Sequence, residues 1–337
     1  MTKIFTLTQS AGAALSVVSS SRFNSPNNTA KTPLRAVANS AIEATARYLA
    51  ASQSEATKRA YAQDIRMFRA AGGCIPCDPA VVMKYLVQHA EKLSVATLER
   101  RLTAIHQLHV ANGFESPAKD KQLKKLMQGI RRVQGTKQRR VQALVKDDLI
   151  AALVMAERQI HAAKIARDRA LLLVGFAGAF RRSELVAIRV EHITRLSNGI
   201  EIELPRSKTD QFGESRQVFI PAASVERRCP VLAIEKWLVV AKPTEGFVFR
   251  SVSRHGHVGV SGLTPHSVAL IVKSSVSNAG GNSELVSGHS LRAGYVTAAA
   301  EAGLQPYQIV ETTGHKSLTT LAKYIRPLSR RKIPSLL

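Results

Sequence analysis

Four side chains near the C-terminus have the types that attack on a phosphodiester requires. His289 and Arg292 are three residues apart, His315 follows a glycine, and Tyr324 comes nine residues later. A tyrosine hydroxyl can attack a backbone phosphorus and hold the strand as an ester, which keeps the bond energy for resealing. The five-coordinate phosphorus carries two negative charges that fixed donors must match. The His-x-x-Arg spacing places imidazole and guanidinium on one face of a helical turn, where both can reach the same oxygens.

Each of these residues, taken alone, also has an ordinary structural explanation. A Gly-His pair commonly ends a helix, and a Tyr near a C-terminus commonly packs half-buried. Two upstream features enlarge the set. Arg181 precedes Glu184 by three residues after a long apolar run, and Lys208 falls at a tight connection between two strand-like runs. A turn lysine is itself common on protein surfaces, so the prediction depends on the ordered set rather than on any one member.

In chain order, this set resembles the catalytic residues of the tyrosine recombinases, also called the phage integrase family. The resemblance extends from about Ser54 to Tyr324, and Gly-His followed by the Tyr nine positions later is the family's own spacing. One departure is Ala293, where many members carry a second His; other members lack it, and we expect no loss of activity. The implied roles are: Arg181 and Arg292 on the scissile phosphate, Lys208 as the acid that protonates the leaving 5′ oxygen, His289 and His315 as further donors, Tyr324 as the nucleophile and Glu184 as a supporting residue.

The charge balance favours a polyanionic partner. The 337 residues include 48 Lys and Arg against 24 Asp and Glu, a formal charge of +24, and the pI is near 10.5. Such an excess of cations binds nucleic acid by releasing its counterions. Solubility and attraction to a membrane surface are the alternatives, but no basic amphipathic helix stands apart from the expected domains to favour a membrane.

Cysteine usage and hydropathy exclude several other classes. Three cysteines in a chain of this length favour a reducing cytoplasm over a disulfide scaffold. Cys74 and Cys77 form a lone CxxC without a His cluster nearby, which disfavours zinc, and Cys229 is typical of a core. No apolar run reaches the 18 residues of a membrane span. The run from Ala11 to Val18 is short and interrupted by a serine, so we interpret it as part of a flexible arm rather than a signal peptide.

Residues 39–134 are expected to form a helical block after a disordered arm over 1–38. Ser54 can cap a helix in which Tyr61, Ile65 and Phe68 share one buried face. Further helices are predicted over 79–89, from Ser94 to Gly113 with His109 as a packing residue, and from Ser116-Pro117 to about Val133. By its resemblance to the family, this block is a core-binding domain that grips one face of a duplex.

A basic connector follows the helical block. Between Lys119 and Arg140 there are nine Lys or Arg and one Asp, a density that favours phosphate contact over a merely solvated helix face. The residues predicted to contact DNA are Arg59, Arg66, Arg69, Arg100, Arg101, Lys124, Arg131, Arg132, Lys137, Arg139 and Arg140.

The catalytic block is expected over 143–326. A strand-like alternation over 193–204, broken by a Ser-Asn-Gly turn, predicts a hairpin, and a third strand is predicted over 217–220, which places Lys208 on the turn between the last two strands. Trp237 is expected in the core, and His255 and His257 in a Gly-rich loop have no assigned role. Helices are predicted over 146–157, 163–176, from Arg181, and over 230–240, 265–277, 291–302 and 306–312.

Together these features predict a mostly α protein. The resemblance implies a SAM-like helical core-binding domain over 39–134, a basic linker over 135–142, an α+β catalytic domain with a small antiparallel sheet, and a tail over 327–337. It also implies a site-specific recombinase that works through a 3′-phosphotyrosine in a homotetramer on double-stranded DNA with inverted repeats. No metal, nucleotide or other cofactor and no membrane are expected, and the location is cytoplasmic, at the nucleoid of a bacterium, phage or plasmid host.

Two other functions remain compatible with the sequence. A type IB topoisomerase uses a similar set of residues but relaxes supercoils as a monomer, and a DNA-binding protein could keep the fold without catalysis. The DNA site, the biological task and any helper proteins do not follow from the sequence.

Overall fold

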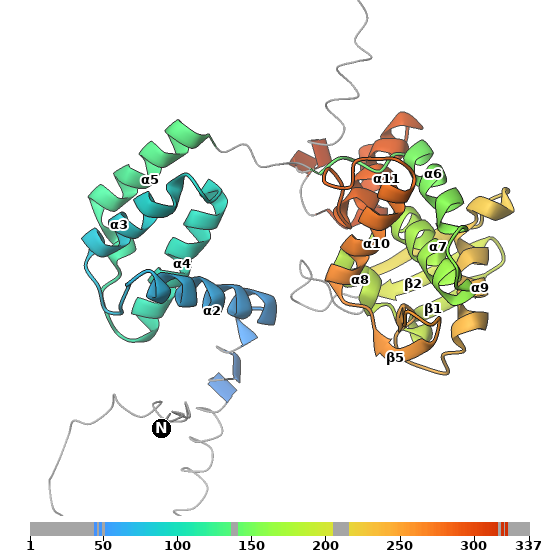
Figure 1. Ribbon diagram of the computed structural model, residues 1–337, viewed down its shortest axis with the longest axis horizontal. Helices are drawn as coiled ribbons and strands as arrows, with labels where there is room; N and C mark the ends of the chain where they lie inside the picture. The colour runs from blue at the N-terminus through green and yellow to red at the C-terminus, as the bar shows by residue number, and fades with distance from the viewer. Residues whose placement is uncertain are drawn as a thin grey trace, which may run out of the picture. The chain divides into compact units, whose positions relative to one another are not determined.

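The computed structural model describes residues 44–45, 47–48, 51–135, 141–204, 216–315, 318–319 and 321–322. The chain divides into two compact units, residues 1–130 and residues 131–337, and the division falls in the last turn of a helix (Figure 1). The domain boundaries expected from the sequence stay predictions, and the expected arm over 1–38 and tail over 327–337 lie outside the described residues.

The N-terminal unit is a helical bundle, and several of its helices begin directly after a capping side chain. Ser54 and Ser94 each accept a hydrogen bond from the backbone N–H three residues later. The helix predicted from Ser116 is divided instead: Ser116 caps a short 3-10 turn, and the Asp120 carboxylate accepts from Leu123 N at 2.8 Å and starts a new helix. The elements are α2 (Glu55–Ala70), α3 (Pro79–Ala90), α4 (Val95–Ala111), the 3-10 helix η1 (Pro117–Lys119) and α5 (Lys121–Gln134).

A buried acid joins α2 to α4 inside this unit. Asp64 is 2% exposed and accepts two hydrogen bonds from Arg100, at 2.8 and 2.9 Å. Arg101 lies 3.7 Å from the same carboxylate, donates to the Tyr85 hydroxyl and is itself buried. A buried carboxylate requires such partners. His109 is fully buried and accepts from Cys77 N through Nε2, as a packing histidine does.

The C-terminal unit combines helices with two small antiparallel sheets. One sheet has the order β1-β2-β3, and Leu204 at the end of β2 pairs with Arg216 at the start of β3. The other is the hairpin β4-β5, for which no strands were predicted; His255 and His257 lie in the loop between its strands, as expected. The elements of the C-terminal unit are α6 (Lys146–Ala156), α7 (Ala162–Ala177), α8 (Arg182–Ala187), η2 (Val190–His192), β1 (Ile193–Leu196), β2 (Gly199–Leu204), β3 (Arg216–Pro221), η3 (Glu226–Arg228), α9 (Pro230–Ala241), β4 (Arg250–Val252), β5 (Val258–Gly262), α10 (Pro265–Asn278), α11 (His289–Glu301) and α12 (Pro306–Thr313).

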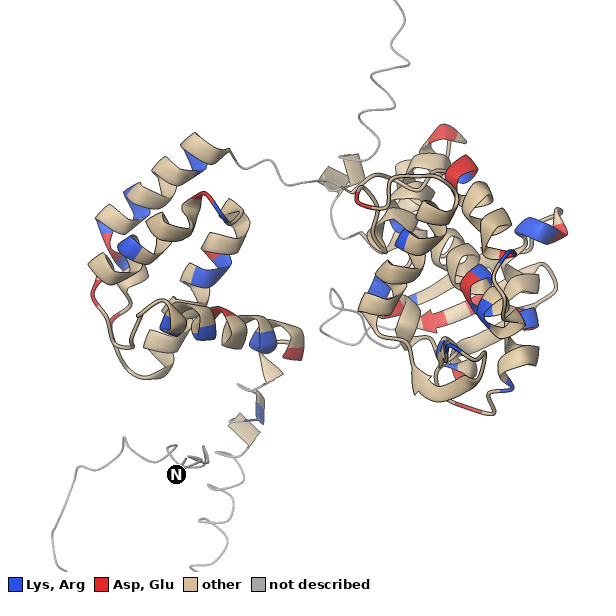
Figure 2. Ribbon diagram, in the orientation of Figure 1, with Lys and Arg blue, Asp and Glu red and all other residues tan. Residues whose placement is uncertain are grey.

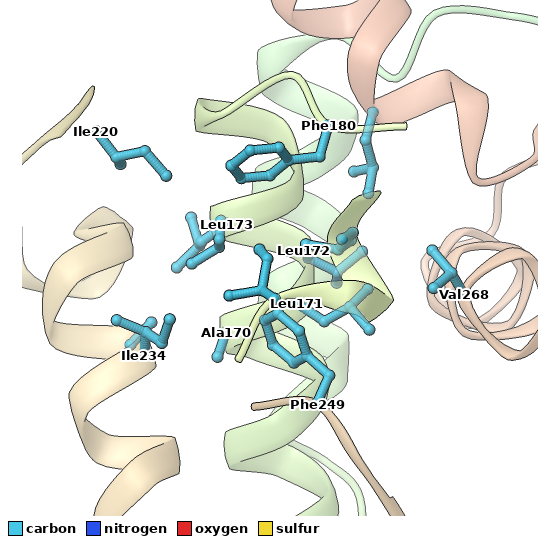
Figure 3. Close-up of a cluster of buried hydrophobic side chains, with 14 of the residues drawn as sticks. Ala170, Leu171, Leu172, Leu173, Phe180, Ile220, Ile234, Phe249 and Val268 are labelled. Carbon is cyan, nitrogen blue, oxygen red and sulfur yellow. The ribbon is translucent and has the colours of Figure 1, made fainter. Parts of the chain in front are cut away.

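Helix α7 lies at the centre of the core of this unit. Its residues 170–175 are all buried, as the apolar run predicted. Figure 3 shows Phe180, Ile220, Ile234, Phe249 and Val268 around it, so that the loop after α7, the first sheet, α9 and α10 all pack on one helix. Trp237 is fully buried and donates to Val248 O at 2.8 Å.

The predicted fold class is confirmed: the chain is mostly helical, with small antiparallel sheets in the C-terminal unit. Among the described residues, no helix has both the length and the apolar character needed to cross a bilayer.

Residues 142–144 form backbone hydrogen bonds with the first turn of α11 and with the loop before it. Leu144 N donates to Ser290 O at 2.9 Å, and Gln142 N donates to Leu285 O at 2.7 Å. Gly294, one turn further along α11, faces the same segment so closely that a Cβ on it would lie 1.9 Å from Leu144 O. Because backbone cannot move away as a flexible side chain can, this position requires glycine.

We predict that Gly294→Ala destabilises the C-terminal unit by about 1–3 kcal/mol, the usual scale of overpacking. The only tryptophan, Trp237, lies in this unit, so the midpoint of urea unfolding followed by its fluorescence reports this unit. Gly129→Ala is the matched control, because Gly129 lies inside α5 and a Cβ there meets nothing within 4 Å. That control should leave the Trp237 transition unchanged, and an unshifted midpoint in Gly294→Ala would contradict the close contact.

Candidate active site

Glu184 holds Arg181 in place at the start of α8. Its carboxylate is buried, with the residue 4% exposed, and it accepts from Arg181 N at 2.8 Å and from Arg181 Nη1 at 2.5 Å. An acid at the third helical position that accepts from the N-cap N–H is the arrangement of a capping box. Arg181 also donates to Gly314 O at 3.4 Å, so its guanidinium lies between α8 and the end of α12.

Arg292 is positioned by the loop that precedes Arg181. The side chain is 3% exposed on α11, and its Nη1 donates to Ala179 O at 2.7 Å. Ala179 has φ +49°, a left-handed conformation that costs a non-glycine residue about 1 kcal/mol. This turn aims the Ala179 carbonyl at Arg292, so the two predicted phosphate-binding arginines are fixed by residues only a few positions apart.

His289 is the first residue of α11 and is exposed at the surface of the C-terminal unit. Partial burial and then the Arg292 guanidinium lower the pKa of its imidazole, with smaller contributions from Arg182 and Arg181. The preceding Gly288 packs on the Arg182 stem, where a Cβ would lie 2.4 Å from Arg182 Cδ. His289 is therefore close to the arginine cluster, as the His-x-x-Arg spacing predicted.

His315 is presented by the end of α12. Gly314 takes φ +62° and ends the helix, which brings the next residue back toward Arg181. The Thr313 hydroxyl donates to Ile309 O at 2.6 Å and therefore accepts from His315 Nδ1, which lies 2.8 Å away. A neutral His315 then carries its proton on Nδ1 and a lone pair on Nε2. In that form it suits proton acceptance, and donation from Nε2 requires the imidazolium.

Burial, followed by Arg292 and Arg181, lowers the pKa of His315 from 6.5 to about 4. His289 and Arg216 contribute in the same direction. The side chain is thus neutral at pH 7 in the absence of DNA. Four predicted site residues, Arg181, His289, Arg292 and His315, are therefore brought together with Glu184 in one electrostatic cluster.

The other two predicted catalytic residues, Lys208 and Tyr324, lie outside the described residues. Lys208 belongs to the segment 205–215, which follows β2 and precedes β3. Tyr324 follows Leu321, which is 1% exposed and packs with Val296 of α11 and Ile309 of α12. The chain thus packs against α11 and α12 three residues before the predicted nucleophile.

The predicted DNA contacts on α2, α4 and α5 fall into two groups. Most of those described are exposed: Arg59, Arg66 and Arg69 on α2, and Lys124, Arg131 and Arg132 on α5. Figure 2 shows the basic residues spread along these helices. Arg101 is instead buried beside Asp64, so we assign it a structural role. Arg100 also bonds Asp64, but its side chain is 48% exposed, so it stays among the predicted phosphate contacts. Lys137, Arg139 and Arg140 lie outside the described residues.

Two arginines near the site were missing from the predicted set. Arg182 lies beside His289, and Arg216 donates to Thr312 O and to Glu184 Oε2, the latter at 3.5 Å. Their partners are distant in sequence, so no local spacing could identify them. Among the described residues, no group of three His, Cys, Asp or Glu side chains could hold a metal ion. The absence of a cofactor stays a prediction.

We predict that His315 titrates near pH 4 in the DNA-free protein, far below an ordinary histidine. An unfolded histidine binds its proton near pH 6.5. As the pH falls from about 6.5 to 4, the unfolded chain is therefore protonated first, and the folded state loses stability. Half-site DNA should raise the pKa, because a bound phosphate offsets the arginine charges. Histidine-selective NMR titration measures both values, and a pKa of 6.5 without DNA would contradict the arrangement.

Comparisons with known proteins show the family and the fold of this chain. Residues 143–331 match the model of the phage integrase family. A protein of Selenomonas ruminantium named integrase/recombinase xerD homolog is 37% identical over 290 residues, which cover 83% of this chain and 84% of the relative. The recombinase cre of Escherichia phage P1 is 24% identical over 274 residues, which cover 75% of this chain and 77% of that protein.

Two solved structures show the same fold. The XerH recombinase bound to palindromic difH substrate, in a post-cleavage complex, has a TM-score of 0.56 at 20% identity and covers 76% of this chain and 71% of that one. A lambda integrase dimer bound to a COC′ core site has a TM-score of 0.59 at 14% identity and covers 85% and 94%. From the family match and the 37% identical relative, the chain belongs to the phage integrase family, the tyrosine recombinases.

Proposed function

We propose that this protein is a site-specific recombinase that cleaves and rejoins DNA through a 3′-phosphotyrosine at Tyr324, by paired strand exchange in a homotetramer. The observation that supports it most is the joint placement of Arg181 and Arg292. One is fixed by Glu184 and the other by the Ala179 carbonyl, and both influence the pKa of His315. A single phosphate at this cluster would meet two guanidinium groups at once.

The two arginines supply positive charge that offsets the negative charge of the transition state. Each guanidinium presents several N–H donors in a rigid plane that matches phosphate oxygens. Because protein partners already hold both side chains, little reorganisation is needed as negative charge develops on phosphorus. A neutral His315 would then accept the Tyr324 proton through Nε2, a different role from the donor that the resemblance implied. Lys208 is the proposed acid for the leaving 5′ oxygen, and these donors take the place of a metal or nucleotide.

The proposed partner is double-stranded DNA with inverted repeats. XerH is solved on a palindromic substrate and lambda integrase as a dimer on a core site, which supports duplex binding by more than one subunit. The exposed cations of α2 and α5, together with Arg100 of α4, are the proposed phosphate contacts of the helical bundle. Each such contact steepens the decrease of log binding constant with log salt concentration by about 0.9.

We predict that Tyr324→Phe abolishes the SDS-stable protein–DNA adduct on a nicked half-site while half-site affinity stays within about twofold, because only the attacking oxygen is lost. Tyr307→Phe is the matched control: Tyr307 is 67% exposed on α12 and should be dispensable. Adduct formation should continue in excess chelator. An adduct that still forms with the Tyr324→Phe variant would overturn the assignment of the nucleophile.

Recombination between paired sites and relaxation of a supercoiled plasmid separate the proposed activity from a topoisomerase. Recombination that requires two sites is expected. Relaxation without recombination would indicate a type IB-like enzyme, and binding without any adduct would indicate a non-catalytic DNA-binding protein.

We also propose that the C-terminal tip, residues 333–337, docks on a neighbouring protomer. The C-terminal unit has an apolar cavity of about 560 Å³, lined in part by Leu149, Leu153, Phe176, Phe219 and Leu304. The tip reads Ile-Pro-Ser-Leu-Leu on a basic stem, so its apolar side chains match this lining. The alternative is that the tail folds back on its own unit or stays loose.

We predict that deleting residues 333–337 weakens cooperative binding to the full site and strand exchange, with half-site binding unchanged. Phe219→Ala, which trims the cavity wall, should cause the same defect and add little to the deletion, because both remove one contact. Gel-shift titrations of half and full sites measure this. Unchanged cooperativity after the deletion, or additive defects, would contradict docking in this cavity.

A further inference from the structure

Arg216 is the first residue of β3, and its side chain connects parts of the C-terminal unit that are far apart in sequence. Its guanidinium is mostly buried, with the side chain 21% exposed. Nη1 donates to Thr312 O, and Nη2 lies 3.5 Å from Glu184 Oε2. The group also packs on Gly314, where a Cβ would lie 3.0 Å from Arg216 Nε. One side chain from the edge strand β3 therefore contacts both α8 and the end of α12.

The contact with Thr312 fixes the end of a helix. The last carbonyls of a helix have no partner within it and carry partial negative charge, so a cation there is favourable. Two residues after Thr312 comes Gly314, whose left-handed turn presents His315. A guanidinium on one side of this turn and Arg181 Nη2 on the Gly314 carbonyl hold the turn from two directions.

Through its contact with Glu184, Arg216 is also linked to Arg181, because both arginines donate to this carboxylate. The Glu184 carboxylate already receives two hydrogen bonds from Arg181, and Arg216 approaches the oxygen that the Arg181 backbone N–H uses. Arg216 therefore adds positive charge to the site without occupying the guanidinium surface of Arg181. The contact is long, so the Thr312 bond is the stronger of the two.

We propose that Arg216 is a positioning residue for DNA cleavage, which holds the Thr312–His315 turn against Glu184 and so sets the place of the His315 imidazole. The proposal rests on the proposed function only for its activity readout. An apolar side chain at this position would leave the Thr312 carbonyl and one edge of Glu184 without this donor. His315 would then occupy a wider range of positions.

The activity test is a double-mutant cycle in single-turnover cleavage of a nicked half-site at saturating DNA. Arg216→Met should cleave about tenfold more slowly or worse. The loss should stay smaller than the about 10²-fold loss expected when a direct donor to the reacting group is removed. Arg216→Lys should recover part of the rate, since an ammonium can still reach Thr312 O. In a His315→Ala background, Arg216→Met should cost less than about threefold, because its effect acts through His315.

The matched control is Gln217→Met, the next residue of β3, whose side chain is exposed. It should leave the rate unchanged, and half-site affinity and the Trp237 unfolding midpoint should stay near the parent values in Arg216→Lys. Equal costs of Arg216→Met with and without His315, or a parent-like rate in Arg216→Met, would overturn the proposal.

A second readout does not require activity. In DNA-free protein, Arg216→Met should raise the pKa of His315 above its parent value, since it removes a cation and loosens the turn, whereas Gln217→Met should not. If the unsubstituted protein forms no adduct, the proposed function is wrong, but the pKa of His315 can still be measured and compared. An unchanged His315 pKa in Arg216→Met would defeat the positioning role of Arg216.

Discussion

The buried carboxylate of Glu184 is the interaction on which the site depends. A charge removed from water must be paired closely, and Glu184 is paired with the N–H and guanidinium of Arg181 and with Arg216. Because these partners come from α8 and β3, and Arg216 in turn bonds the end of α12, one acid fixes three elements relative to one another. Loss of this acid would leave two arginines without their shared counter-charge.

The second constraint is the strained turn between α7 and α8. Its Ala179 carbonyl must point at Arg292, and the left-handed backbone that achieves this is tolerated because Ala179 and Phe180 are buried against α7. The apolar α7 thus positions Arg292 indirectly, because the core around it holds a turn that an isolated peptide would not adopt. On the other side of Arg292, Gly294 lets the segment at Leu144 lie directly on α11.

The sequence predicted those features that local rules determine. Ser54 and Ser94 mark helix starts because a side-chain oxygen caps the N–H groups that follow, and the run over 170–175 could only be core. The order of Arg181, His289, Arg292 and His315 predicted a cluster because a phosphate requires several donors, and the structure brings these side chains together. Their catalytic roles stay predictions, as do those of Lys208 and Tyr324.

Contacts between distant residues could not be predicted in this way. Arg216 meets Thr312 across 96 residues, and no periodicity records such a pairing. Arg101 was assigned to DNA because it is basic and lies on a basic helical unit, yet Asp64, on another helix, draws it inside. The β4-β5 hairpin has strands of only three and five residues around a Gly-containing turn, too short for an alternating pattern to be recognised.

The most direct test of this account is to identify the residue that carries the DNA. The adduct formed on a nicked half-site would be digested with a protease and a nuclease, and the nucleotide-bearing peptide sequenced by mass spectrometry. The account predicts a single peptide with Tyr324 joined to a 3′ phosphate. A nucleotide on any other residue, such as the exposed Tyr307, or a linkage to a 5′ phosphate, would contradict it.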